Sequence, residues 1–310
     1  MNDIKVLMAI QYSLPLTTTP LVDLAENLGK NYYDLEKEIK FYKDNGILRR
    51  YGVTLNYKAL SNFKQAALVG FRAGDYIRVA NLLNSFDEIK IKHNFLRDSF
   101  YNLWFTVKGY DVEEIKKFVD EVAKKTGVAD YVVLPTKKVY KMDVKYDLYR
   151  GISWSEKIIE LEEVPSLKDL GIEEEFILQL ESLPVERRPF RSFGYKEEEI
   201  VSILEELIKK GVCRDFSGIL NEKKIGFKEN GMFAIKTSKP SKIAEKLLYS
   251  YPQITHLVER IPSEKWNYSL YFMVHATSRE PIERIKSEVE KLNSVEDVTV
   301  IYSKENLRNP

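Results

Sequence analysis

The histidines of this sequence are few, and all three fall in two similar stretches of the chain. His93 opens the run HNFLR, which ends at Arg97; His256 opens HLVER, which ends at Arg260, and His275 follows shortly after. Imidazole exchanges a proton near neutral pH, and a guanidinium can hold a carboxylate through two parallel hydrogen bonds. Aromatic residues surround both stretches. These residue types suit a flat ligand that carries carboxylates.

The aromatic runs YNLWFTVKG, from Tyr101, and YSLYFMVHA, from Tyr268, read as the strands that follow these histidines. Alternate side chains on neighbouring strands share one face, so we expect a cleft at the sheet face of each copy. Lys108 and His275 take the same place in the two copies. The second cleft is favoured as catalytic because it holds two imidazoles. The expected catalytic residues are His93, His256 and His275, and the expected ligand-binding residues are Arg97, Tyr101, Asn102, Lys108, Arg260, Trp266 and Tyr268. The alternative is that these are half-buried residues supporting a sheet interface.

Four pairs of similar segments occur in the same order in the two halves of the chain. They are LPLTTTPL with LPVERRPF, GILRRYGVTLN with GVCRDFSGILN, HNFLR with HLVER, and YNLWFTVKG with YSLYFMVHA. Repetition in a fixed order indicates a duplicated unit.

Helical patterns open each copy. Leu35, Ile39 and Tyr42 recur at helical spacing, Asn31 is a suitable N-cap, and an earlier helix starts near Pro20. With the short β-wing that follows, this predicts a winged helix-turn-helix. The second copy keeps the long helix but shortens the segment before it, so its helix-turn-helix is degenerate.

The rest of each copy alternates strand and helix patterns in the order βαββαβ, which predicts a ferredoxin-like domain. The expected fold class is therefore α+β, a tandem duplication of a winged helix-turn-helix followed by a ferredoxin-like domain. The expected divisions are 1–60 and 169–226 for the helical units, 61–148 and 227–310 for the ferredoxin-like domains, and 149–168 for a linker with at most a short helix. The two sheets are expected to pair within one chain as a pseudo-dimer, with a further homo-oligomer left open.

Composition excludes several classes of protein. Lys and Arg number 48 against 47 Asp and Glu, a net charge of +1, and the helix expected to read DNA carries Asp34, Glu36 and Glu38, so nucleic acid is disfavoured as a partner. The sequence offers no apolar run long enough to cross a bilayer and no signal-peptide pattern, so a cytoplasmic protein is expected. Cys213 is the single cysteine, and the sequence has no zinc spacing, so no metal site of its own is expected.

HNFLRDSFYNLWFTV and LPTKKVYKMDVKYDL resemble the smaller-subunit type of siroheme decarboxylase. THLVERIPSEKWNYSLYFMVHA resembles the partner subunit, and LRRYGVTLN fits the wing of both. The similarity covers about residues 1–148 and 170–305, so the chain looks like both subunits fused. The fold is shared with the leucine-responsive/asparagine-operon regulators. Ser269 departs from the pattern, which has Asn as at Asn102, and so does the second wing pair, Arg214 and Asp215.

The resemblance implies a non-oxidative carbon–carbon lyase. It would remove carbon dioxide from two acetate side chains of siroheme to give 12,18-didecarboxysiroheme, in an alternative haem or haem d1 pathway. No cofactor of its own is implied, because the iron arrives with the substrate. In that chemistry the arginines would hold spectator carboxylates and a histidine would supply the proton.

Two other functions remain open at this point. One is a DNA-binding regulator of the leucine-responsive/asparagine-operon family with a small-molecule effector site. The other is an inactive tetrapyrrole-binding subunit.

Overall fold

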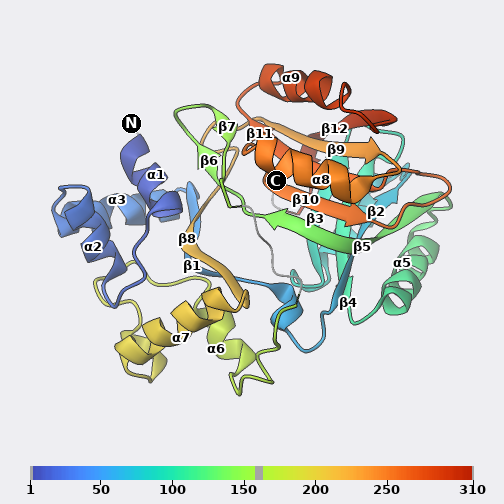
Figure 1. Cartoon of the computed structure of the whole chain (residues 1–310). Helices are drawn as coiled ribbons and strands as arrows, with labels where there is room; N and C mark the ends of the chain where they lie inside the picture. The colour runs from blue at the N-terminus through green and yellow to red at the C-terminus, as the bar shows by residue number, and fades with distance from the viewer. Residues whose placement is uncertain (1–2, 158–162, 309–310) are drawn as a thin grey trace. The chain divides into compact units, whose positions relative to one another are not determined.

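The structure is a computed structural model that describes residues 3–157 and 163–308. The chain divides into two compact units, and each unit draws on both halves of the sequence. The first comprises residues 1–61, 145–152 and 163–228; the second comprises 62–144, 153–162 and 229–310. The two helical segments thus form one unit, and the two βαββαβ segments form the other (Figure 1).

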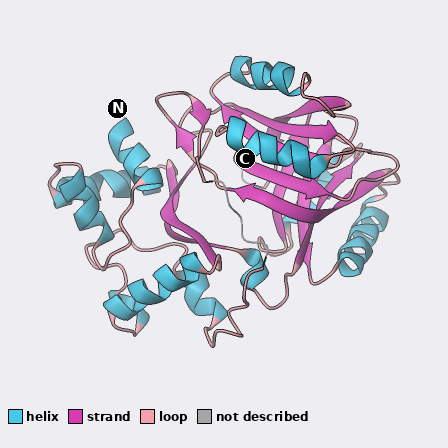
Figure 2. Cartoon of the chain, viewed as in Figure 1, coloured by secondary structure: helices cyan, strands magenta, loops and turns pink. Residues whose placement is uncertain are grey.

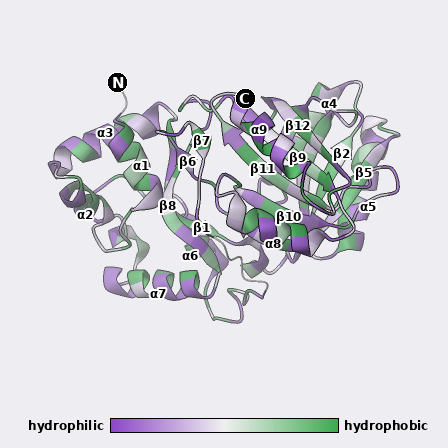
Figure 3. Ribbon diagram, turned by 45° about the horizontal axis from the view of Figure 1, so that its top comes forward, coloured by the Kyte–Doolittle hydropathy of each residue, from purple (hydrophilic) through white to green (hydrophobic). Residues whose placement is uncertain are grey.

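The first unit is mainly helical (Figure 2). Its elements are α1 (Ile4–Tyr12), α2 (Pro20–Asn27), α3 (Tyr32–Asp44), β1 (Leu48–Leu55), η1 (Tyr57–Ala59), β6 (Tyr146–Asp147), α6 (Glu174–Gln179), η2 (Arg191–Phe193), α7 (Glu197–Lys209) and β8 (Cys213–Leu220). Hydrophobic and hydrophilic residues alternate along α7 in Figure 3, as in a helix with one buried face.

Helix α3 forms as its sequence predicts. The Asn31 side chain accepts a hydrogen bond from the Tyr33 amide and so caps the first turn. Leu35, Ile39 and Tyr42 are all buried on one face. The chain leaves the helix at Gly46, whose φ of 67° suits a glycine.

The two predicted wing segments pair with each other: β1 and β8 form an antiparallel two-stranded sheet. The segment around Glu181 also holds β1, because Arg50 donates from Nη1 to the Val53 and Glu181 carbonyls at 2.8 and 2.7 Å. Arg50 is therefore a structural residue, which differs from the solvated position expected of a wing. Arg49 beside it is exposed.

The second unit has two successive βαββαβ segments, in the predicted order. The first contains β2 (Gln65–Phe71), α4 (Tyr76–Asn84), β3 (Ile91–Arg97), β4 (Leu103–Gly109), α5 (Val112–Thr126) and β5 (Tyr131–Met142). The second contains β9 (Glu229–Lys236), α8 (Pro240–Ser250), β10 (His256–Arg260), β11 (Leu270–Ala276), α9 (Glu280–Val289) and β12 (Asp297–Asn306).

Eight strands of this unit form one closed sheet, in the order β10-β5-β2-β4-β3-β12-β9-β11. The ring closes because β10 pairs antiparallel with both β5 and β11. The two copies meet at β3–β12 and at β5–β10. Each strand therefore lies four positions around the ring from its counterpart in the other copy, and β3 lies opposite β10.

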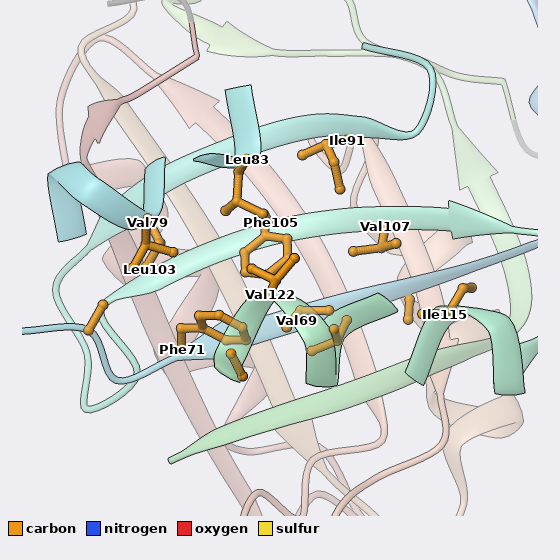
Figure 4. Close-up of a cluster of buried hydrophobic side chains, with 14 residues drawn as sticks. Val69, Phe71, Val79, Leu83, Ile91, Leu103, Phe105, Val107, Ile115 and Val122 are labelled. Carbon is orange, nitrogen blue, oxygen red and sulfur yellow. The ribbon is translucent and has the colours of Figure 1, made fainter. Parts of the chain in front are cut away.

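The helices cover the outer face of the closed sheet. In the first copy, α4 and α5 pack on β2, β3, β4 and β5 over a core that includes Phe71, Phe105 and Val119. Figure 4 shows side chains of this core, among them Phe71 and Phe105, gathered between the strands and the helices. Since Leu103, Phe105 and Val107 point outward to this core, Trp104, Thr106 and Lys108 point inward.

Residues 149–168, predicted as a linker with at most a short helix, contain the short strand β7 (Ile152–Ser153). The Ser153 hydroxyl accepts a hydrogen bond from the His275 amide at 3.1 Å and donates to the Gln253 carbonyl at 2.6 Å. These two hydrogen bonds of Ser153 fix the segment against backbone groups of the second copy. The part of the prediction that falls on 158–162 lies outside the described residues.

Candidate functional site

The histidine-bearing end of the closed sheet is where chemistry-capable side chains converge. His256 pairs with Met273 across two strands, and Met273 packs against the inner core, so His256 faces inward. Lys108 faces inward beside Ala66, and His275 does so beside Asn230. His93 joins them, because its pKa responds to the charges of both Lys108 and His256.

His93 lies at this end of the sheet, close to the charges of Lys108 and His256. Its side chain is exposed, yet enough protein surrounds it for desolvation to be the largest influence on its pKa. Burial, followed by the positive charges of Lys92, His256, Lys108 and Arg97, lowers the pKa of His93 well below its ordinary value. His93 is therefore neutral at neutral pH, in surroundings that are cationic.

The other inner side chains at this end differ in their exposure. His256, Thr106 and Met273 are partly exposed although they point into the closed sheet, whereas Lys108 and His275 are buried at 8% and 5% exposure. An interior lined by three imidazoles and an ammonium group attracts an anion.

Both arginines of the HNFLR and HLVER motifs bind the neighbouring strand of the other copy. Arg97 Nη1 donates to the Ile301 carbonyl at 3.0 Å and its Nη2 donates to Asn230 Oδ1 at 3.2 Å. Arg260 Nη1 donates to the Leu134 carbonyl at 3.3 Å and to Thr136 Oγ1 at 3.0 Å. These contacts show that both arginines help to join the two copies.

The aromatic candidates lie at the other end of the strands. His93 and Arg97 are four positions apart in the sequence, which is about 13 Å along a strand. Tyr101, 2% exposed, packs edge-on against Trp104 and Trp266 with ring centroids 6.1 and 5.8 Å apart. The ring centroids of Tyr268 and Trp266 lie 4.9 Å apart. The structure thus collects the aromatic residues in a cluster of their own and does not place them beside the histidines.

Asn102 ties down the turn between β3 and β4. Its side chain accepts from the Ala73 amide at 2.8 Å and donates to the Ala73 carbonyl at 2.9 Å. Ser269, in the same position of the second copy, donates to the Thr237 carbonyl at 3.2 Å. The departure from Asn to Ser therefore keeps a bond from this turn to the chain just after the neighbouring strand.

Three residues beyond the expected site residues contribute to this region: Phe95, on the strand of His93, and the unexpected Asn230 and Thr255. The His93 and Phe95 ring centroids lie 6.0 Å apart. The Asn230 side-chain oxygen accepts a hydrogen bond from Arg97, and Thr255 Oγ1 lies 2.9 Å from His256 Nδ1. Alternation along HNFLR places Phe95 on the same face as His93 and Arg97. Asn230 could not be found from the sequence, because Arg97 lies 133 residues away, and no strand pattern shows that the Thr255 side chain contacts the neighbouring His256.

Within residues 3–157 and 163–308, no three His, Cys, Asp or Glu side chains are grouped so that they could hold a metal ion. Cys213 is buried, and desolvation raises the pKa of its thiol to about 12. None of the helices in these ranges is both long enough and apolar enough to cross a membrane.

Comparison with known families gives a match that follows the duplicated architecture. The model of the AsnC-like ligand binding domain matches residues 63–141 and again 224–308, which together are more than half of the chain. The chain belongs to this family. Each match covers one βαββαβ segment, so the closed sheet consists of two AsnC-like domains in one polypeptide.

Individual relatives add detail to this AsnC-like assignment. The chain is 27% identical to the siroheme decarboxylase of Hydrogenobacter thermophilus over 96% of this chain and 90% of that protein. It is 27% identical to the siroheme decarboxylase beta subunit of Methanosarcina barkeri, over 40% of this chain and 84% of that subunit. The resemblance to siroheme decarboxylases with both subunit types fused is thereby confirmed.

A solved structure shares the fold along nearly the whole chain. The crystal structure of the siroheme decarboxylase NirDL in co-complex with an iron-uroporphyrin III analogue superimposes with a TM-score of 0.65 and 23% identity. It covers 98% of this chain and 91% of that one. The duplicated AsnC-like architecture therefore occurs in another protein.

Proposed function

We propose that this chain is a siroheme decarboxylase, a non-oxidative carbon–carbon lyase that converts siroheme to 12,18-didecarboxysiroheme. The observation that carries the proposal is the inward convergence of His93, His256, His275 and Lys108, where the charges acting on His93 are cationic. Siroheme presents several carboxylates, which such surroundings attract. The product would enter an alternative haem or haem d1 pathway.

The reaction needs orientation, desolvation and one proton for each carboxylate lost. The bond between the acetate methylene and its carboxylate breaks, carbon dioxide leaves, and the electron pair stays on the methylene carbon beside the delocalising macrocycle. An imidazolium N–H then protonates that carbon to give a methyl group, and water restores the imidazolium. Balance requires no oxidant and no cofactor of the protein's own; the iron belongs to the substrate.

The histidines divide these roles between them. We assign the proton donor to His256, with His275 on the adjacent strand beside it. His93 is neutral, so it serves as a hydrogen-bonding or orienting group in the proposed site. Lys108 supplies a permanent cation for a carboxylate that is retained. The other expected site residues support the shape of the interior by packing and hydrogen bonding. They are Arg97, Arg260, Tyr101, Asn102, Trp266 and Tyr268.

We further propose that the fused chain is an intramolecular pseudo-dimer. The pairs β3–β12 and β5–β10 would stand where relatives with separate alpha and beta subunits join two chains. In this proposal residues 61–148 and 227–310 are the two ligand-binding domains. Residues 1–60 and 169–226, the winged and the degenerate helix-turn-helix, are retained as packing elements, because Glu36 and Glu38 on α3 pair with Lys40 and Lys30 of the same unit.

The test is anaerobic incubation of the purified chain with siroheme, followed by mass spectrometry of the tetrapyrrole. The expected result is loss of two carbon dioxide units, with turnover reduced in His256→Asn and His275→Asn. Thr126→Val, at the end of α5, removes only a hydroxyl bonded to the Val122 carbonyl and serves as the control. An unchanged substrate mass would refute the proposal, and full activity in both histidine variants would refute the choice of donor.

A further inference from the structure

Thr255 is the residue immediately before His256, and it is held rigidly between two strands. Its amide donates to the Met273 carbonyl at 3.0 Å, and its own carbonyl accepts from the Asp143 amide at 2.8 Å. The side chain is 1% exposed. The Thr255 hydroxyl oxygen lies 2.9 Å from His256 Nδ1 and 3.3 Å from the Met273 carbonyl oxygen. One hydroxyl therefore faces an imidazole nitrogen and a backbone acceptor together.

The distances indicate where the single hydroxyl proton goes when His256 is neutral. The contact to Nδ1 is the shorter of the two, and the Met273 carbonyl already accepts the Thr255 amide. This geometry favours a hydroxyl that donates to Nδ1 when His256 is neutral. Because a neutral imidazole carries one proton, that proton then sits on Nε2.

The same geometry also accommodates the imidazolium. When His256 is protonated on both nitrogens, Nδ1–H donates to the threonine oxygen, and the hydroxyl rotates to donate to the Met273 carbonyl. No side chain has to move. A group that gives up and regains a proton in every cycle needs a partner that satisfies it in both states.

The first copy has no equivalent of this device. Alignment of HNFLR with HLVER places Lys92 where the second copy has Thr255, and the Lys92 side chain is exposed and cationic. Its charge is the largest electrostatic influence lowering the pKa of His93, after burial. The residue before the histidine thus opposes protonation in one copy and accommodates it in the other.

We propose that Thr255 is a positioning residue that fixes the ring and tautomer of His256 and stabilises its protonated form, so that His256 serves as the proton donor. This inference rests on the proposed function. Titratable groups near His256 come from four strands: His93 on β3, Lys108 on β4, His275 on β11 and Asp143 just after β5. Thr255→Val leaves all of these charges in place, so a change in the pKa of His256 would report the hydroxyl itself.

The test compares Thr255→Val, which removes the hydroxyl from a side chain of the same shape, with Thr255→Ser, which keeps it. Long-range ¹⁵N–¹H correlation spectra of the full-length protein, recorded without siroheme, give the tautomer and pKa of each of its three histidines. In the wild type we expect neutral His256 to carry its proton on Nε2. In the valine variant we expect the pKa of His256 to fall. The kcat for decarboxylation should fall roughly three- to tenfold, as the loss of one hydrogen bond predicts, with a smaller change in KM. Serine should restore both.

The outcomes separate this inference from the proposed function. A wild-type His256 protonated on Nδ1 would overturn the inference without any variant. An unchanged pKa and kcat in Thr255→Val, with wild-type turnover intact, would overturn it as well. If the wild type does not turn over siroheme but the valine variant lowers the pKa of His256 and serine restores it, the proposed function fails and the control of His256 by Thr255 stands.

Discussion

His93 and His256 lie on opposite strands of one closed sheet, and the charge of His256 lowers the pKa of His93. The histidines of the two copies therefore share a single interior, where the sequence had suggested one cleft per copy. Because each cation disfavours another nearby, a proton gained by His256 makes protonation of His93 harder. The duplicated chain can thus keep the His93 imidazole neutral while the His256 imidazole gains and loses a proton.

The cationic surroundings of His93 can be tested by removing one charge at a time. Lys108→Met and Lys92→Met should each raise the pKa of His93, because each removes a positive charge that disfavours the imidazolium. Lys116→Met, on the exposed side of α5, is the matched control and should leave it unchanged. NMR titration of the histidine ring protons measures all three. A pKa of His93 that does not respond to Lys108→Met would remove Lys108 from the site.

Stability should depend on pH through His93 in a definite direction. The pKa of His93 is lower in the folded state than the ordinary value of 6.5, so the unfolded chain binds the proton more readily. The contribution is fully present above pH 6.5 and is lost as the pH falls below it. Urea unfolding at pH 7.5 and 5.5 should show a larger loss of unfolding free energy for the wild type than for His93→Gln. Equal losses would show that His93 is not held neutral by the fold.

Lys141 predicts a second pH effect at higher pH. Lys141 as a whole is 3% exposed, its ammonium group donates to the Ser155 carbonyl at 2.6 Å, and burial lowers its pKa to about 8. The unfolded chain keeps that proton up to a pKa of about 10.4, so the wild type should gain stability relative to Lys141→Met as the pH rises from 8 to 10.5. Thermal unfolding at both pH values tests this, with exposed Lys116→Met as the control. A constant difference would indicate an ordinary lysine pKa.

The sequence was a good guide wherever structure depends on neighbours in the chain. The spacing of Leu35, Ile39 and Tyr42 and the cap at Asn31 predict α3, and duplication predicts the two βαββαβ segments. What it could not predict depends on distant partners. The closed sheet requires β3 to pair with β12 and β5 to pair with β10, and no local pattern specifies these pairs.

The candidate site shows the same division. All three histidines and Lys108 were expected to line a ligand site from their place on strands, and the structure brings them to one interior. Arg97 had been assigned to a carboxylate, but its carbonyl partner, Ile301, lies 204 residues away in the sequence. Residue type alone does not distinguish a guanidinium that holds a ligand from one that holds a neighbouring strand.

The arginines that join the copies should differ in their effect on stability. Arg97 is 4% exposed, and Arg97→Met leaves the Ile301 carbonyl and the Asn230 amide oxygen without this donor, which costs about 1.5 to 3 kcal/mol. Arg260 is less buried, so Arg260→Met should cost less. Arg49→Met, at an exposed position of the first unit, is the control and should change stability by no more than about 0.5 kcal/mol. Urea unfolding ranks the three, and a loss in Arg49→Met as large as that in Arg97→Met would contradict this account.

Gly70 and Trp104 test how tightly the aromatic end of the closed sheet is packed. They pair across β2 and β4, and a Cβ atom at Gly70 would lie 2.9 Å from the Trp104 ring. Trp104 is 1% exposed, so its ring cannot move away easily, and Gly70→Ala should cost about 1 to 3 kcal/mol through overpacking. Gly74→Ala is the matched control, because no atom lies within 4 Å of the added carbon. In the background of Trp104→Phe, whose smaller ring leaves room, Gly70→Ala should cost less. Urea unfolding of the four proteins in this double-mutant cycle measures the coupling, and additive losses would show that the two residues do not compete for space.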